Sequence, residues 1–145
     1  MSWAYEVLVK KAKTEWDTLD QSATTVVSVG LSECSLSSGA YQVKQAIEQW
    51  SSQRSGALVV EEVGCLGLCY AEVIIDIRKP GRPRLFFCSV TPENVGKLLE
   101  DYLDRDHAES RFVLGSLGDT MLPGIPSLWD NPMLKPQYRI VMQNF

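Results

Sequence analysis

Residues 58–77 read LVVEEVGCLGLCYAEVIIDI, and this stretch carries the pattern on which the fold depends. Two short apolar runs, 58–63 and 73–77, stand on either side of a loop that contains Cys65 and Cys69. Both runs are rich in β-branched residues, so they are predicted to be strands. Glycines in the loop let the backbone turn tightly and come close to a bound group. Thiols placed in a turn beside two strand ends indicate a functional site rather than a buried core.

The segment before this stretch predicts a parallel βαβ unit. Residues 24–29 read TTVVSV and form a first short strand, and Cys34 follows its end. A helix is predicted over residues 40–50, because its apolar residues recur every three or four positions: Ala40, Val43, Ile47 and Trp50. Ser37 and Ser38 are expected to cap this helix. A strand, a helix and a second strand joined by short links form a unit that is almost always right-handed.

The segment after the cysteine loop predicts an antiparallel hairpin and a further helix. Pro80 and Gly81 suit the two central positions of a type II turn between strands at 73–77 and 84–90. Thr91 stands where it can cap the helix that follows. The predicted fold class is therefore α/β, with a mixed four-stranded sheet. The sheet combines the parallel unit with the antiparallel hairpin and is flanked by helices.

The chain divides into three predicted parts. Residues 1–22 hold an N-terminal helix with an apolar stripe that begins at Trp3. Residues 23–103 form the α/β domain. Residues 104–145 are a Pro-rich connector or docking arm that cannot form a second packed core of its own. Its apolar residues need cover, either on the domain or on a partner: Leu122, Ile125, Leu128, Trp129, Met133 and Leu134.

Composition and charge narrow the classes of function. The chain has 145 residues, of which 45% are hydrophobic, and this is enough for one globular core. A net charge of −4 argues against nucleic acid as the main partner. The sequence has no secretory pattern and no run near the roughly 18 to 20 apolar residues that span a membrane, so we expect a cytoplasmic location without membrane insertion. A peripheral place on the cytoplasmic face of a membrane complex is compatible with this. Four cysteines in such a chain are interpreted as reduced thiols.

The predicted topology brings all four cysteines to one edge of the sheet. Cys34 and Cys65 follow the ends of two parallel strands, and open α/β sheets place their ligands at that edge. Cys69 precedes the strand that runs back from the edge, and Cys88 lies near the end of the strand that returns to it. Four thiolates can hold a [2Fe–2S] cluster, with two sulfurs for each iron. Zinc also accepts four thiolates, although usually from C-x2-C pairs, whereas Cys65 and Cys69 have C-x3-C spacing.

Three motifs together resemble the thioredoxin-like [2Fe–2S] ferredoxin family. They are CSLSSGA at 34–40, GCLGLC at 64–69 and VTPE at 90–93. More closely, the chain resembles the N-terminal domain of NADH-oxidising flavoprotein subunits, which occur in bacterial complex I, NAD-linked hydrogenases and related bifurcating enzymes. GIP at 124–126 and KPQYRIV at 135–141 resemble the connector that leads into the FMN- and NADH-binding domain of those subunits.

The resemblance implies a thioredoxin-like electron-transfer module of an NADH-linked oxidoreductase of the NADH dehydrogenase or hydrogenase type. The family's ligand pattern for its [2Fe–2S] cluster is C-x4-C followed by C-x3-C. Cys34, Cys65 and Cys69 match three of these four positions, so they are the residues expected to bind the cluster. The first position falls on Val29, which has no donor atom.

Several interpretations stay open at this point. Ser32 or Cys88 replaces the missing ligand, or the domain is a cluster-free scaffold that docks subunits of the same kind of complex. A thiol redox protein is a third interpretation, because Cys65 and Cys69 are close, although C-x3-C is a poor redox pair. The resemblance implies a flavoprotein domain or subunit and other redox subunits as partners, with FMN and NAD bound only there. The chain has a single histidine, His107, and no complete active site is predicted in it.

Overall fold

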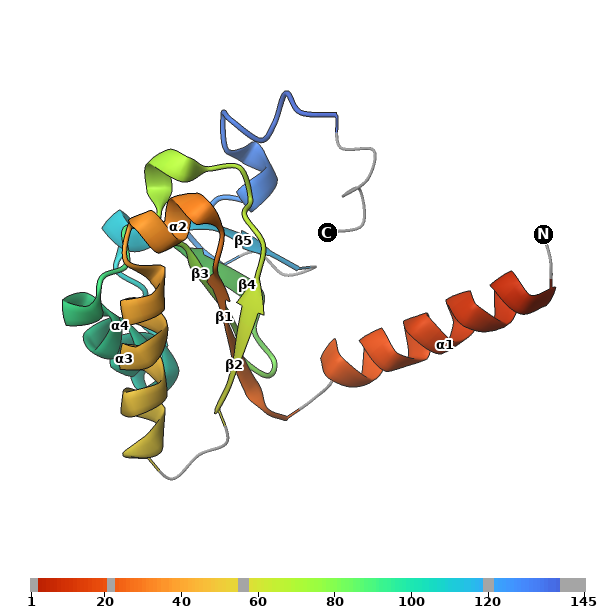
Figure 1. The fold of residues 1–145 in the computed structure, drawn as a ribbon, viewed down its shortest axis with the longest axis horizontal. Helices are drawn as coiled ribbons and strands as arrows, with labels where there is room; N and C mark the ends of the chain where they lie inside the picture. The colour runs from red at the N-terminus through yellow and green to blue at the C-terminus, as the bar shows by residue number, and fades with distance from the viewer. Residues whose placement is uncertain (1–2, 21–22, 55–57, 119–121, 139–145) are drawn as a thin grey trace.

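The computed structural model describes residues 3–20, 23–54, 58–118 and 122–138 (Figure 1). Its centre is a five-stranded sheet with the order β2-β1-β3-β4-β5. The strands are β1 (Thr25–Gly30), β2 (Leu58–Val63), β3 (Ile75–Arg78), β4 (Arg84–Phe87) and β5 (Val113–Leu117). β1 and β2 are parallel, and the other neighbouring pairs are antiparallel. The predicted mixed α/β sheet is confirmed, with one strand more than expected.

The additional strand, β5, comes from the segment that was expected to be a connector. It pairs with β4, so that Phe86 lies opposite Gly115 and Arg84 opposite Leu117. A Cβ atom on Gly115 would lie 2.7 Å from the Cα atom of Leu128, so glycine allows the following chain to cross close to this strand. The strand is short and contains a glycine, and its local pattern is therefore weak.

Two helices cover one face of the sheet. Figure 1 shows α3 (Ala40–Ser52) and α4 (Pro92–Arg105) side by side on that face. The main core lies between these helices and the sheet, and its largest fully buried members include Val29, Ile47, Phe87 and Leu99. α4 begins where the sequence predicts, because the Thr91 hydroxyl accepts a hydrogen bond from a backbone N–H of the first turn.

The opposite face of the sheet carries a second, smaller core. Side chains alternate between the two faces along a strand, so Ile74 and Phe86 point away from the helices. They pack with Leu66 and Leu68 of the cysteine loop and with the end of the described chain, at Leu128 and Leu134. The apolar tail therefore lies back on the domain through these two leucines, while Trp129 and Met133 stay exposed. The expected end of the connector, residues 139–141, lies outside the described residues.

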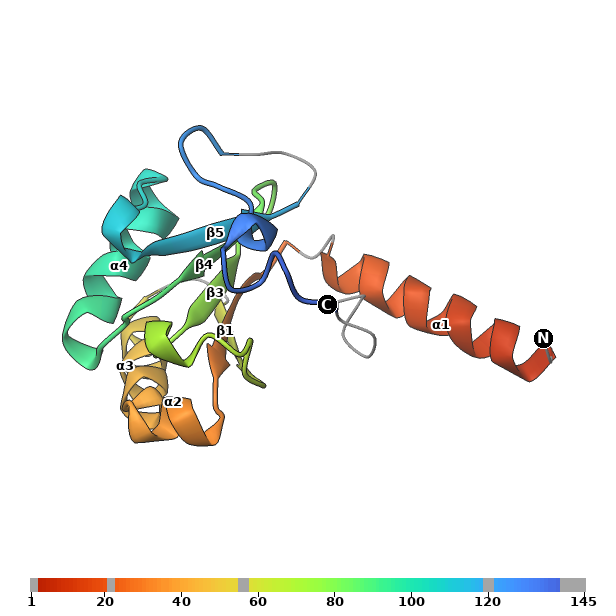
Figure 2. The ribbon, with the colours of Figure 1, turned by 90° about the horizontal axis from the view of Figure 1, so that it is seen from above.

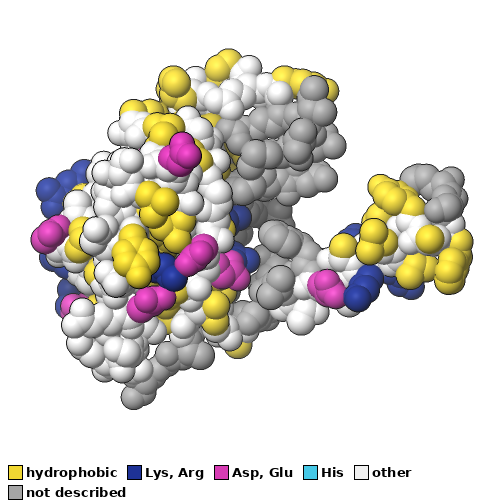
Figure 3. All heavy atoms as spheres, in the orientation of Figure 1, with side chains coloured by type: hydrophobic (Ala, Val, Ile, Leu, Met, Phe, Trp, Pro, Cys, Tyr) yellow, Lys and Arg dark blue, Asp and Glu magenta, His cyan; other side chains and the backbone are white. Residues whose placement is uncertain are grey.

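The N-terminal helix α1 (Trp3–Asp20) extends away from the sheet (Figures 1 and 2). The apolar side chains that the structure describes on this helix join neither core: Trp3 is 79% exposed and Val7 is 47% exposed. Figure 3 shows apolar side chains on the visible surface of this helix. Within the described residues, no helix is long and apolar enough to cross a membrane.

Candidate functional site

All four cysteines lie at the same end of the sheet, where β1, β2 and β4 end and β3 begins. Three of them, Cys34, Cys65 and Cys69, lie in the loop and turns beyond that end. Cys34 is in the short helix α2 (Glu33–Ser37), which follows β1, and Cys65 lies in the loop after β2. Cys69 begins the single turn η1 (Cys69–Ala71) that leads toward β3. Figures 1 and 2 show α2 and this turn close together at that end. The parallel direction of β1 and β2 places both cysteine segments there.

The thiols of these three cysteines interact with one another. Cys34 raises the pKa of the Cys69 thiol, first through a hydrogen bond between them and then through charge repulsion. Burial also raises this pKa, while a hydrogen bond with Cys65 lowers it. Cys34 and Cys69 are exposed and Cys65 is half-buried. The structure thus brings Cys34, Cys65 and Cys69 into one group at the surface.

Backbone geometry holds the cysteine loop in place. Gly67 has a φ of 82°, a left-handed conformation that favours glycine. In this conformation its N–H donates a hydrogen bond to Cys65 Sγ, with an N···S distance of 3.1 Å. A backbone N–H directed at the sulfur fixes the orientation of the side chain, so the loop is suited to present Cys65 as a ligand.

Ser32 is the N-cap residue of α2. Its backbone N–H donates to the Ser35 hydroxyl at 2.7 Å, and the two hydroxyl oxygens lie 2.8 Å apart.

The N-cap residue of α3 is Gly39, with a φ of 93°, so Ser37 and Ser38 do not cap α3 as the sequence predicts. Ser37 instead ends α2, because its neighbours fold into this separate short helix.

Cys88 has a different environment from the other three thiols. It lies just after β4, its N–H donates to the Phe112 carbonyl at 2.8 Å, and its side chain packs against the second core. Burial raises the pKa of the Cys88 thiol. Val29, at the first position of the family's ligand pattern, is fully buried in the main core.

Glu72 is a member of this site that the sequence analysis missed. Cys65 Sγ donates a hydrogen bond to Glu72 Oε1 across 3.7 Å, and Glu72 Oε2 accepts a hydrogen bond from the Ile74 N–H at 3.2 Å. Its charge also raises the pKa of Cys69. The signal that could have identified it is a lone carboxylate in the apolar segment between Cys69 and β3.

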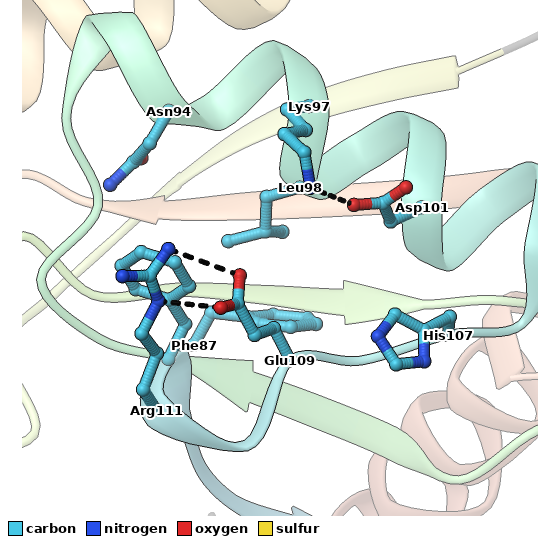
Figure 4. Close-up of a pocket in the computed structure, with 9 residues that line it drawn as sticks. Phe87, Asn94, Lys97, Leu98, Asp101, His107, Glu109 and Arg111 are labelled. Atoms are coloured by element: carbon cyan, nitrogen blue, oxygen red, sulfur yellow. Dashed lines mark hydrogen bonds and ion pairs between the residues drawn. The ribbon is translucent and has the colours of Figure 1, made fainter.

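A separate cavity of about 60 Å³ lies between α4 and the segment before β5 (Figure 4). Its charged groups are paired within the wall: Lys97 lies 2.7 Å from Asp101, and Arg111 lies 2.7 Å from Glu109. His107 lines the same cavity and is exposed. The described lining contains no serine, threonine or cysteine, so this cavity presents no hydroxyl or thiol nucleophile.

Comparison with solved structures identifies the fold. A thioredoxin-like [2Fe–2S] ferredoxin from Aquifex aeolicus matches with a TM-score of 0.57 and 17% identity, covering 72% of this chain and 99% of that one. A structure of the wild-type thioredoxin-like [2Fe–2S] ferredoxin from the same organism matches with a TM-score of 0.55 and 18% identity, covering 65% and 99%. The chain has the thioredoxin-like ferredoxin fold. The fold class and the resemblance predicted from the motifs are confirmed.

Sequence comparison points in the same direction. The NADP-reducing hydrogenase subunit HndB of Solidesulfovibrio fructosivorans is 28% identical over 99 residues, covering 64% of this chain and 77% of that subunit. No family model matches the chain. The thioredoxin-like ferredoxin fold is thus combined with similarity to a hydrogenase subunit.

The donor atoms can be tested against a [2Fe–2S] cluster, the group named for these solved structures. Across the described part of the chain, no three His, Cys, Asp or Glu side chains are grouped so that they could hold one metal ion. A [2Fe–2S] cluster makes a different demand, because it takes its ligands as two pairs, one on each iron. Cys69 interacts with both Cys34 and Cys65, and Cys65 Sγ also donates to Glu72, so these donors form one connected group and not two separate pairs. Three thiols are present for the four ligands that a cluster takes, and the position that would supply the fourth thiolate is occupied by Val29.

Proposed function

We propose that this chain is an electron-transfer module of an NAD(P)-linked, hydrogenase-type oxidoreductase. In this proposal Cys34, Cys65 and Cys69 hold a [2Fe–2S] cluster at the end of the sheet. The observation that carries the proposal is the convergence of these three thiols in a thioredoxin-like ferredoxin fold. Similarity to a hydrogenase subunit supports the kind of complex to which the module belongs.

A bound [2Fe–2S] cluster would supply the one-electron chemistry. The chain's own residues would then set its surroundings. The Gly67 N–H would keep its hydrogen bond to Cys65 Sγ and favour the reduced state by stabilising negative charge on sulfur. Cys34 and Cys69 are exposed, so a partner's redox group could approach this edge closely.

The partner proposed here is a flavoprotein domain or subunit that binds FMN and NAD, together with other redox subunits of a cytoplasmic complex. In this proposal residues 104–145 lead toward the flavoprotein partner, although β5 and Leu128, which lie within this segment, belong to the folded domain. Trp129, Met133 and Tyr138 remain exposed on this segment and are suited to contact a partner. Leu128 is fully buried and is not available for that contact.

Anaerobic reconstitution with iron and sulfide tests the cluster directly. We expect about two irons per chain, visible absorption, and an S = 1/2 EPR signal after reduction. Cys65→Ser and Cys69→Ser should lose most of the iron and the signal. Cys88→Ser is the matched control and should retain both, because Cys88 packs in the second core. Equal iron in the wild-type protein and in all three variants would contradict the proposed ligands.

A second candidate function is a cluster-free docking scaffold, and the burial of Val29 favours it. A ligand position occupied by a core valine offers no donor atom to a metal. This function predicts that an affinity-tagged chain copurifies from its native host with an FMN-containing subunit even when it carries Cys65→Ser. Trp129→Ala together with Met133→Ala should then lower the amount of copurified FMN. Unchanged FMN in this double variant would argue against docking through that surface.

A further inference from the structure

A cavity of about 400 Å³ lies between the end of α4, the turn that joins β3 to β4, and the chain that follows β5. It is far larger than the cavity of about 60 Å³ beside Lys97, and it has the size of small-molecule pockets. Arg82 lines it from the β3–β4 turn, which lies at the opposite end of the sheet from the cysteines. No cysteine is among the described residues that line this cavity, so it is separate from the site at the cysteine loop.

The wall of the cavity is apolar and held by backbone hydrogen bonds. In the turn of residues 122–125, the Ile125 N–H donates to the Leu122 carbonyl at 3.0 Å, and Gly124 has a φ of 78°. The Pro126 carbonyl then accepts a hydrogen bond from the Ser116 N–H of β5 at 2.9 Å. This wall suits the apolar body of a ligand. Its partly buried side chains also pack against the main core: Ala108, Val113, Leu122 and Ile125.

Tyr102 contributes a buried hydroxyl beside this cavity. The residue is 2% exposed and lines the cavity, and its hydroxyl has no hydrogen-bond partner within the described part of the chain. Burial raises the pKa of the Tyr102 phenol, and the charges of Arg82 and Asp106 also act on it, so the hydroxyl lies close to these two residues of the lining. With its raised pKa the phenol keeps its proton at neutral pH. Because a buried polar group without a partner is costly, this hydroxyl is suited to donate a hydrogen bond to a ligand.

The charges around this hydroxyl favour an anion. The Asp106 carboxylate binds two cations, with Lys79 Nζ at 2.5 Å and Arg82 Nη2 at 2.6 Å. One negative charge between two positive charges leaves a positive excess. Within the described ranges, Asp106 is the only side chain that accepts a hydrogen bond from the Arg82 guanidinium. The other N–H groups of this guanidinium can donate to a carboxylate, because its planar shape matches theirs.

We propose that this cavity binds a small organic anion, a carboxylate with an aromatic or aliphatic body. The carboxylate would accept hydrogen bonds from Tyr102 and Arg82, and the apolar body would lie against Val113, Leu122 and Ile125. Binding there would not require a cluster, because the cavity shares no described residue with the cysteine group. The ligand site is therefore additional to the proposed electron-transfer function.

The test is a titration of the isotope-labelled full chain with benzoate, followed by amide chemical shifts in NMR spectra. Benzamide and benzylamine keep the ring but are neutral and cationic, so they are the control probes. Benzoate should cause saturable shifts at the amides of Val113, Gly124 and Ile125. It should bind about tenfold more tightly than benzamide, as expected for hydrogen bonds to a charged group, and benzylamine should bind least.

Two variants remove the proposed donors one at a time. Tyr102→Phe keeps the ring and its edge-on contact with Phe87, and it should weaken benzoate binding about tenfold with a Tm close to that of wild type. Arg82→Gln should weaken benzoate binding by a similar factor and affect benzamide less. Arg111→Gln is the matched control, because Arg111 lines the smaller cavity, and it should bind benzoate as the wild-type protein does.

Three results would overturn the proposal. Benzoate shifts that do not saturate, or that lie away from the cavity, would remove the ligand site. Equal affinities for benzoate, benzamide and benzylamine would contradict the preference for an anion. Wild-type affinity for benzoate in folded Tyr102→Phe or Arg82→Gln would contradict the role of the residue that was changed.

Discussion

The Arg84 guanidinium donates two hydrogen bonds to the Asp76 carboxylate, from Nε at 2.6 Å and from Nη2 at 2.9 Å. Asp76 is only 3% exposed, on the face of β3 that α3 and α4 do not cover. The Ser28 hydroxyl lies 3.5 Å from the same carboxylate, so the group links β1, β3 and β4. A buried carboxylate held in this way depends on its partner, because an unpaired charge away from water is costly.

Arg84→Ala should therefore lower the free energy of unfolding by about 3 to 5 kcal/mol, as measured by urea denaturation. The matched control is Arg82→Ala, which breaks an ion pair with Asp106 in which both side chains are well exposed. Its effect should be much smaller, since water screens exposed pairs. Similar losses in the two variants would show that the Asp76 pair does not stabilise the sheet.

Gly115→Ala should destabilise the fold through a backbone clash. The added Cβ atom would lie 2.7 Å from the Cα atom and 2.8 Å from the backbone nitrogen of Leu128. Because backbone atoms cannot move aside as a flexible side chain can, we expect a loss of about 1 to 3 kcal/mol and a lower Tm in thermal unfolding. Gly64→Ala is the control, since its Cβ atom would meet no atom within 4 Å. A Tm for Gly115→Ala equal to that of Gly64→Ala would contradict the close approach.

Asp106 should contribute to stability in a pH-dependent manner. A hydrogen bond from Lys79 and then one from Arg82 hold the pKa of its carboxyl below the ordinary value of 3.8. Because the pKa is lower in the folded state, this stabilisation is complete above the unfolded pKa and is lost as the pH falls through the folded pKa. Asp106→Asn, which suits the left-handed φ of 52°, should lower the urea midpoint at neutral pH. The difference in urea midpoint between this variant and the wild-type protein should shrink below about pH 4. Equal midpoints for the two proteins at neutral pH would contradict a stabilising role for the Asp106 carboxyl.

The cysteines should differ in their rates of alkylation in the metal-free protein. Cys34 and Cys69 are exposed, whereas Cys88 is partly buried in the second core, and burial raises the pKa of its thiol. Since burial limits both access to Cys88 Sγ and formation of its reactive thiolate, iodoacetamide at neutral pH should modify Cys88 more slowly than Cys34, as followed by mass spectrometry of peptides. Rapid labelling of Cys88 while the protein remains folded would show that its thiol is accessible.

Local signals predicted the parts of the fold that depend on nearby residues. The turn at Lys79 to Arg82 formed as expected, with Gly81 at a φ of 71° and the Arg82 N–H bonded to the Lys79 carbonyl at 3.0 Å. Thr91 caps α4 for the same reason, since both partners of its hydrogen bond lie within one turn. β5 was not predicted, because its stability comes from pairing with β4 and from contact with Leu128.

The sequence by itself determined that Cys34 and Cys65 lie at one end of the sheet, because each follows one of two parallel strands. It also determined that Cys69 lies nearby, since only three residues separate it from Cys65. Only the tertiary structure decided that Val29 points into the core and that Glu72 contacts Cys65. These two outcomes depend on side-chain direction and on how the cysteine loop packs against β1, which no local pattern encodes.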